Sequence, residues 1–147
     1  MKSIRPMSST SDDVGLIPRG FHVHLDCVGY IAPVPDDHVW ILGLMRKAVR
    51  NSSAREVHTH VVPFDGSVSP PGFAAVVLID ESHVTAHCYS DRGLLAIDAF
   101  TCGKTEPEVI IDDLLHSLIE EIPTLQVVNR NRIARFLHDD VSNRNEV

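Results

Sequence analysis

The order of two side-chain periodicities along the chain constrains its fold more than any other feature. Apolar residues recur at helical spacing in two segments, from Asp36 or Asp37 to Arg50 and from Pro107 to Ile122. The segments around them alternate apolar and polar residues, except residues 73–80, which are almost continuously apolar, as is typical of a central strand. The resulting order, β-α-β-β-β-β-α-β, predicts an α+β sandwich: one antiparallel β-sheet with two helices on one face.

The predicted strands are separated by turn residues or by the two helices. They cover residues 21–28, 56–62, 73–80, 84–89, 94–100 and 125–128. Ser90-Asp91-Arg92-Gly93 predicts a hairpin turn with glycine at its last position. The chain then divides into a flexible N-terminal arm (1–19), a folded domain (20–128) and a polar tail (129–147), in which residues 133–137 are expected to form one helical turn.

Length and charge exclude several classes of protein. A chain of 147 residues has room for one hydrophobic core. A net charge of -7 and the lack of a Lys/Arg cluster argue against nucleic-acid binding. No apolar run is long enough to span a membrane, and the first twenty residues lack the apolar stretch of a secretory signal. Three cysteines without a C-x-x-C motif predict a reducing compartment, the cytoplasm.

Histidine pairs are the first candidates for chemistry. His22 and His24 share one face of a predicted strand, and His58 and His60 share one face of another. Four imidazoles could hold a metal ion. No carboxylate or thiolate pattern accompanies them, so we interpret them as ordinary strand residues and predict no metal site. The glycine-rich nucleotide-binding motifs and the G-x-S-x-G hydrolase motif are absent.

A longer pattern surrounds Ser82, which local chemistry alone would assign to a turn. Ser82 is the centre of an E-S-H segment that follows the apolar strand, His87 lies five residues further on, and Cys102 lies twenty residues further on in a D-x-F-T-C-G segment. These motifs and spacings closely resemble the signature of the bacterial and archaeal S-adenosylmethionine decarboxylase proenzymes. The resemblance extends over about residues 20–122.

The resemblance implies a self-processing, pyruvoyl-dependent decarboxylase. The Glu81–Ser82 bond would be cleaved by the Ser82 hydroxyl through an ester, and Ser82 would become a pyruvoyl group that binds the substrate amine as a Schiff base. His87 would serve processing, since imidazole titrates near working pH. Cys102 would donate a proton to the substrate carbanion, a role for which a thiol is a plausible donor at neutral pH. The product would be decarboxylated S-adenosylmethionine, the aminopropyl donor for spermidine synthesis, and the enzyme a homodimer of cleaved two-chain protomers.

The resemblance also implies residues that bind the small-molecule substrate. Asp91 corresponds to a glutamate that binds ribose hydroxyls, in a turn where the family has P-E-Y-G and this chain has S-D-R-G. Tyr89 could stack on adenine, and Asp26 could hold a cationic substrate. Ala74 stands where many relatives have serine. These departures leave two alternatives open: a decarboxylase of L-ornithine or L-arginine from the same family, and a non-catalytic relative.

One geometric expectation concerns the strand after Ser82. Ser82 and His87 are an odd number of residues apart, so a regular strand puts them on opposite faces. A bend or bulge near His83 is therefore required.

Overall fold

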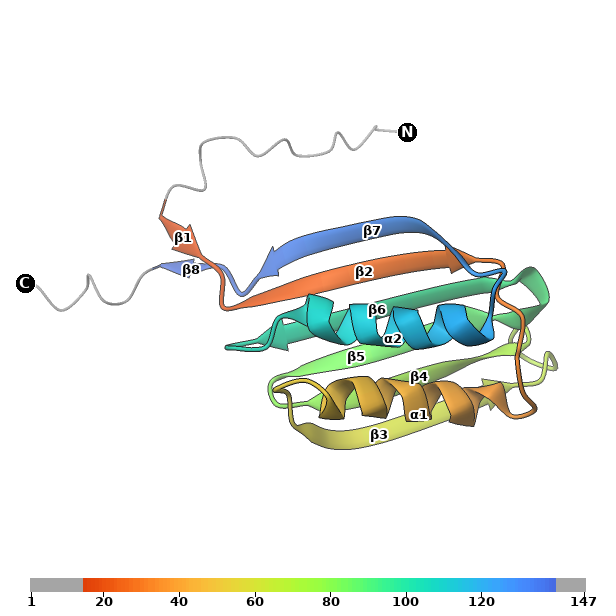
Figure 1. The fold of residues 1–147 in the computed structure, drawn as a ribbon. Coiled ribbons are helices and arrows are strands. Elements are labelled where there is room, and N and C mark those ends of the chain that lie inside the picture. The colour runs from red at the N-terminus through yellow and green to blue at the C-terminus, as the bar shows by residue number, and fades with distance from the viewer. Residues whose placement is uncertain (1–14, 140–147) are drawn as a thin grey trace, which may run out of the picture.

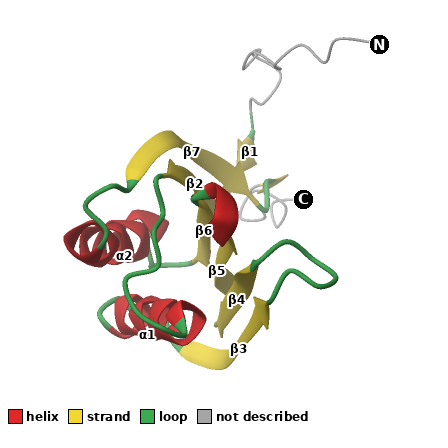
Figure 2. Ribbon diagram, turned by 90° about the vertical axis from the view of Figure 1, so that its right-hand side faces the viewer, coloured by secondary structure: helices red, strands yellow, loops and turns green. Residues whose placement is uncertain are grey.

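The computed structural model describes residues 15–139, which form a six-stranded antiparallel sheet with two helices on one face (Figures 1 and 2). The strands are β2 (Gly20–Val28), β3 (Glu56–Phe64), β4 (Gly72–Ile79), β5 (Ser82–Tyr89), β6 (Leu94–Cys102) and β7 (Gln126–Arg135). Their order in the sheet is β3-β4-β5-β6-β2-β7. The predicted α+β sandwich is therefore confirmed.

The two helices cover the same face of the sheet because each has one apolar side. Helix α1 (Asp37–Arg50) packs on β3 and β4, and helix α2 (Pro107–Glu121) packs on β2 and β6. Their buried side chains recur at helical spacing and include Ile41, Met45, Ala48 and Val49 of α1 and Ile110, Ile111, Leu114 and Leu118 of α2. Neither of these helices, nor any other within residues 15–139, has the length and apolar character needed to cross a membrane.

The sheet has one buried face and one face that neither helix covers. Along β5, Val84, Ala86 and Cys88 are buried toward the helices, and the residues between them are half-buried or exposed on the open face. The hairpin from β5 to β6 turns through a short 3-10 segment, Ser90–Arg92, and ends at Gly93 with a φ of 64°. This is the left-handed conformation that glycine adopts at little cost, as the turn prediction required.

Two expectations at the ends of the domain are wrong. The last strand was expected to stop at residue 128, but β7 runs to Arg135, so the helical turn expected at residues 133–137 does not form. β7 is an edge strand whose side chains are all exposed, and it therefore lacks the apolar alternation by which a half-buried strand is recognised. Part of the expected N-terminal arm is ordered too: β1 (Leu16–Ile17) pairs with β8 (His138–Asp139). Residues 1–14 of the arm and 140–147 of the tail lie outside the described residues.

Candidate active site

A tight hairpin presents Ser82 at the start of β5. Ile79 of β4 pairs with Ser82, so only Asp80 and Glu81 form the turn. Glu81 has a φ of 65°, a left-handed conformation that costs a residue with a Cβ roughly 1–2 kcal/mol. Arg55 holds the other turn residue through two hydrogen bonds to the Asp80 carboxylate, of 2.8 and 2.6 Å. The backbone strain of the turn therefore lies in the residue whose carbonyl precedes Ser82.

Ser82 and Cys102 are brought together, as the resemblance implies. Ser82 is only 8% exposed, and its Oγ donates a hydrogen bond of 3.2 Å to the Sγ of Cys102, the last residue of β6. Gly20 of β2 pairs with Cys102, and a Cβ there would lie 2.6 Å from the Thr101 carbonyl oxygen and 3.0 Å from the Cys102 sulfur. Glycine at this position thus lets β2 lie directly against the thiol.

A cavity of about 640 Å³ opens beside this pair. Its walls come from the turn, from the end of β6 and from both ends of the described chain. They are formed by Arg19, Glu81, Cys102, Phe136, Leu137 and His138. The cavity is within the size range of small-molecule binding sites.

His87 is not brought to Ser82. The pairings of β5 with β4 and with β6 continue without a shift in register, so the expected bend or bulge near His83 is wrong. Ser82 belongs to the buried side of β5 and His87 to the exposed side. Five residues of strand separate them by roughly 16 Å along its axis. Within one chain, the His87 imidazole therefore cannot reach the Ser82 hydroxyl.

His87 lies instead with two of the predicted substrate-binding residues. A cavity of about 300 Å³ near the other end of β5 is lined by His87, Asp26 and Tyr89, among others. The Asp26 carboxylate accepts a hydrogen bond of 3.0 Å from the amide of Asn129. Asp91 is exposed in the following 3-10 segment and does not line this cavity.

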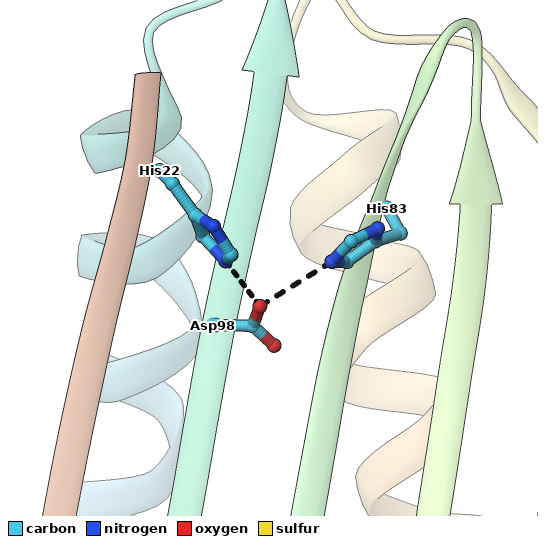
Figure 3. A group of neighbouring side chains, drawn as sticks. All are labelled: His22, His83 and Asp98. Carbon is cyan, nitrogen blue, oxygen red and sulfur yellow. Dashed lines mark hydrogen bonds and ion pairs between the residues drawn. The ribbon is translucent and has the colours of Figure 1, made fainter. Parts of the chain in front are cut away.

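The sequence analysis missed a cluster of His22, His83 and Asp98 on the open face (Figure 3). Both imidazoles hydrogen-bond Oδ2 of Asp98 through Nε2, in the case of His83 at 3.3 Å, and the Thr85 hydroxyl donates to Oδ1. The feature of the sequence that pointed toward this cluster was the spacing of His22 and His24, which are two residues apart on one strand. The four-histidine set considered earlier does not assemble, because three strands separate β2 from β3 in the sheet.

Hydrogen bonds to His22 determine which of its ring nitrogens carries the proton. Arg135 donates a hydrogen bond of 2.7 Å to Nδ1 of His22, so the ring proton of His22 is on Nε2, which donates to Asp98. Burial lowers the pKa of His22 and favours this neutral form. Burial acts to raise the pKa of Asp98, but hydrogen bonds from His83, Thr85 and His22 outweigh it and hold that pKa below its usual range.

These contacts fit a metal ion poorly. The three possible ligand atoms lie within 4.8 Å of one another. A cation bound at Nε2 of His22 would displace the proton from that nitrogen to Nδ1, which would then face the Arg135 guanidinium without an acceptor. We therefore treat the cluster as a hydrogen-bonded network.

Comparisons with known proteins identify the family of the chain. A family model described as S-adenosylmethionine decarboxylase matches residues 21–131. The S-adenosylmethionine decarboxylase proenzyme of Brevibacillus brevis is 33% identical over 103 residues, which cover 69% of this chain and 74% of that protein. Proenzyme 2 of Bacillus cereus is 32% identical over 100 residues, covering 67% and 78%.

The fold has a match among solved structures as well. The crystal structure of the adenosylmethionine decarboxylase from Aquifex aeolicus VF5 superposes with a TM-score of 0.56 at 22% identity, covering 83% of this chain and 90% of that one. With the family model spanning most of the folded part, the chain belongs to the S-adenosylmethionine decarboxylase family.

Proposed function

We propose that this chain is a proenzyme that cleaves its own backbone between Glu81 and Ser82 and becomes a two-chain, pyruvoyl-dependent decarboxylase. The observation that carries the proposal is the contact between the Ser82 hydroxyl and the Cys102 thiol directly after a strained residue. A two-residue turn that leads into a strand does not require glutamate at its left-handed position, since glycine or asparagine would adopt that conformation at less cost.

The residues of the turn suit an N-to-O acyl shift. The Oγ of Ser82 attacks the carbonyl carbon of Glu81, the peptide C–N bond breaks, and an ester and a free amine result. Loss of the Ser82 Cα proton then breaks the Cβ–O bond and releases the Glu81 carboxylate. The dehydroalanine that remains tautomerises, takes up water and loses ammonia, which leaves a pyruvoyl group. The left-handed conformation brings the Glu81 Cβ close to the carbonyl oxygen under attack, so the reaction relieves this clash.

In the mature enzyme, a pyruvoyl group supplies a carbonyl that accepts the electrons left when an amino acid loses carbon dioxide. The surroundings of residue 82 suit such a group, because they are largely shielded from water and include the Cys102 thiol. We assign to Cys102 the return of a proton to the substrate carbon, which its Sγ, 3.2 Å from Ser82 Oγ, supports.

The position of His87 supports a homodimer. His87, Asp26 and Tyr89 share a cavity on the open face, about 16 Å from Ser82 along the strand. A second copy facing this sheet would bring its own His87 and substrate-binding side chains to Ser82 of the first. Mixing Ser82→Ala and His87→Ala proenzymes tests this arrangement. The His87→Ala chain should be cleaved only when the Ser82→Ala chain is present, and cleavage of the His87→Ala chain alone contradicts it.

We propose S-adenosylmethionine as the substrate and decarboxylated S-adenosylmethionine, for spermidine synthesis, as the product. Tyr89 and Asp26 in one cavity support a substrate with an aromatic ring and a positive charge. A second candidate substrate is L-ornithine or L-arginine. The position of Asp91 favours this second candidate. Asp91 corresponds to the ribose-binding glutamate of the family, but it does not line this cavity.

The test is release of labelled carbon dioxide from carboxyl-labelled S-adenosylmethionine, ornithine and arginine offered side by side. The proposal expects turnover of the first and loss of it in Ser82→Ala. Turnover of only ornithine or arginine would select the second candidate. Turnover of none by a fully cleaved protein would make the chain a non-catalytic relative.

A further inference from the structure

The ribbon formed by β1 and β8 lies outside the family match, which ends at residue 131 and begins at residue 21. Figure 1 shows it beyond the end of the sheet where β2 begins and β6 and β7 end. Cys102 is the last residue of β6, so the ribbon and the reacting pair are at the same end of the sheet. Segments from both ends of the described chain therefore meet beside the candidate active site.

These segments supply most of the walls of the cavity of about 640 Å³. Phe136, Leu137 and His138 line it from one segment and Arg19 from the other, opposite Glu81 and Cys102. Phe136 is 58% exposed and Leu137 is 49% exposed. Two large apolar side chains thus face solvent in a cavity that begins at the catalytic thiol, and covering them with an apolar group is favourable.

Several contacts hold this wall of the cavity, formed by Arg19, Phe136, Leu137 and His138, in place. The backbone N–H of Arg19 donates to the carbonyl oxygens of Arg135 and Phe136 at 3.2 and 3.3 Å. Phe136 has a φ of 53°, which turns the chain out of β7, and its ring lies 5.4 Å from that of Phe100, centroid to centroid. The wall therefore packs against the sheet.

The cluster of Figure 3 continues this chain of contacts. The Arg135 guanidinium lies 5.0 Å over the Phe100 ring and donates to Nδ1 of His22, which in turn is fixed by Asp98. A guanidinium held at one end by a neutral, oriented imidazole cannot swing freely. The residue that follows it, Phe136, is positioned as a consequence.

We propose that Phe136 is a specificity-determining residue that contacts an uncharged, planar part of the substrate, and that Arg135, held by His22 and Asp98, is its positioning residue. This rests on the proposed function, because the substrate is the one decarboxylated beside Cys102. A flat ring covers the face of a phenyl group more completely than the aliphatic stem of ornithine or arginine does. The wall therefore favours a substrate that carries a nucleoside over one that ends in an ammonium or guanidinium group.

Steady-state kinetics of the cleaved enzyme test this wall. Phe136→Ala should cleave itself as completely as the wild type, raise KM for S-adenosylmethionine about tenfold and leave kcat within about twofold, since half a phenyl ring's burial is worth roughly a factor of ten. Phe136→Leu should fall between the two and, as the milder change, decides the matter if the alanine variant does not fold. Ile119→Ala, which removes an apolar side chain that is 46% exposed on the outer side of α2, should change neither constant.

The positioning role has its own readout. Arg135→Ala should raise KM as Phe136→Ala does, and Arg135→Lys should restore part of the loss while kcat is unchanged.

An unchanged KM in fully cleaved Phe136→Ala, or a fall in kcat at constant KM, overturns the proposal. If the wild type is never cleaved, the proposed function fails separately. The wall is then tested by calorimetry of S-adenosylmethionine with the uncut chain, where equal affinity for wild type and Phe136→Ala, or no binding, overturns it.

Discussion

Replacing Glu81 with glycine should slow self-cleavage, because it removes the strain stored at the bond that breaks. Glu81 has a φ of 65°, and the clash of its Cβ with the carbonyl oxygen costs roughly 1–2 kcal/mol. If the clash is relieved as that carbonyl is attacked, its removal raises the barrier by the same amount. Cleavage of Glu81→Gly should then be about 5- to 30-fold slower.

Pulse–chase labelling in cell-free translation measures this rate, since cleavage is followed from the moment the chain is made. Glu81→Gln is the matched control: it keeps the Cβ and the strained conformation but removes the charge, so it should cleave at nearly the wild-type rate. The reasoning is refuted if Glu81→Gly cleaves as fast as the wild type. It is equally refuted if Glu81→Gln is as slow as Glu81→Gly, because the carboxylate and not the backbone would then be responsible.

Three further predictions concern catalysis, pH and the core. Cys102→Ala should still cleave but lose turnover by about 100-fold or more, as loss of a general acid does; normal carbon dioxide release would remove the thiol from that role. The folded-state pKa of His22 is lowered by burial, so its contribution to stability is present above about pH 6.5 and is lost as the pH falls further. The thermal midpoint should therefore drop between pH 7 and pH 5, and less steeply in His22→Gln; parallel curves would contradict this. Leu114→Ala, at a position only 1% exposed, should lower the free energy of unfolding in urea by about 2–5 kcal/mol, against less than about 0.5 kcal/mol for the exposed Ile119→Ala.

The sequence predicted those parts of the fold whose residues repeat with a clear period. Both helices were predicted within one or two residues of their observed ends, because one side of each packs on the sheet and is apolar. The family resemblance of the motif implied that Ser82 and Cys102 act at one site, and the two side chains are in contact. β7 had no such signal: an edge strand that is exposed on both faces can be polar throughout, and residues 129–135 therefore resembled a tail.

The remaining features depend on which strands are neighbours. His22, His83 and Asp98 come from β2, β5 and β6, and they meet only because β6 lies between the other two in the sheet. No local pattern encodes that order. The expectation of a bulge near His83 was wrong because β5 is regular along its whole length, which leaves Ser82 on its buried side and His87 on its exposed side.

The central claim, that the chain cuts itself ahead of Ser82, is tested most directly by the intact mass of the purified protein. We predict two polypeptides that separate at this bond, the second beginning with a blocked residue that gains label when radiolabelled substrate and cyanoborohydride are added together. A single polypeptide of 16.3 kDa that takes up no label would contradict the account.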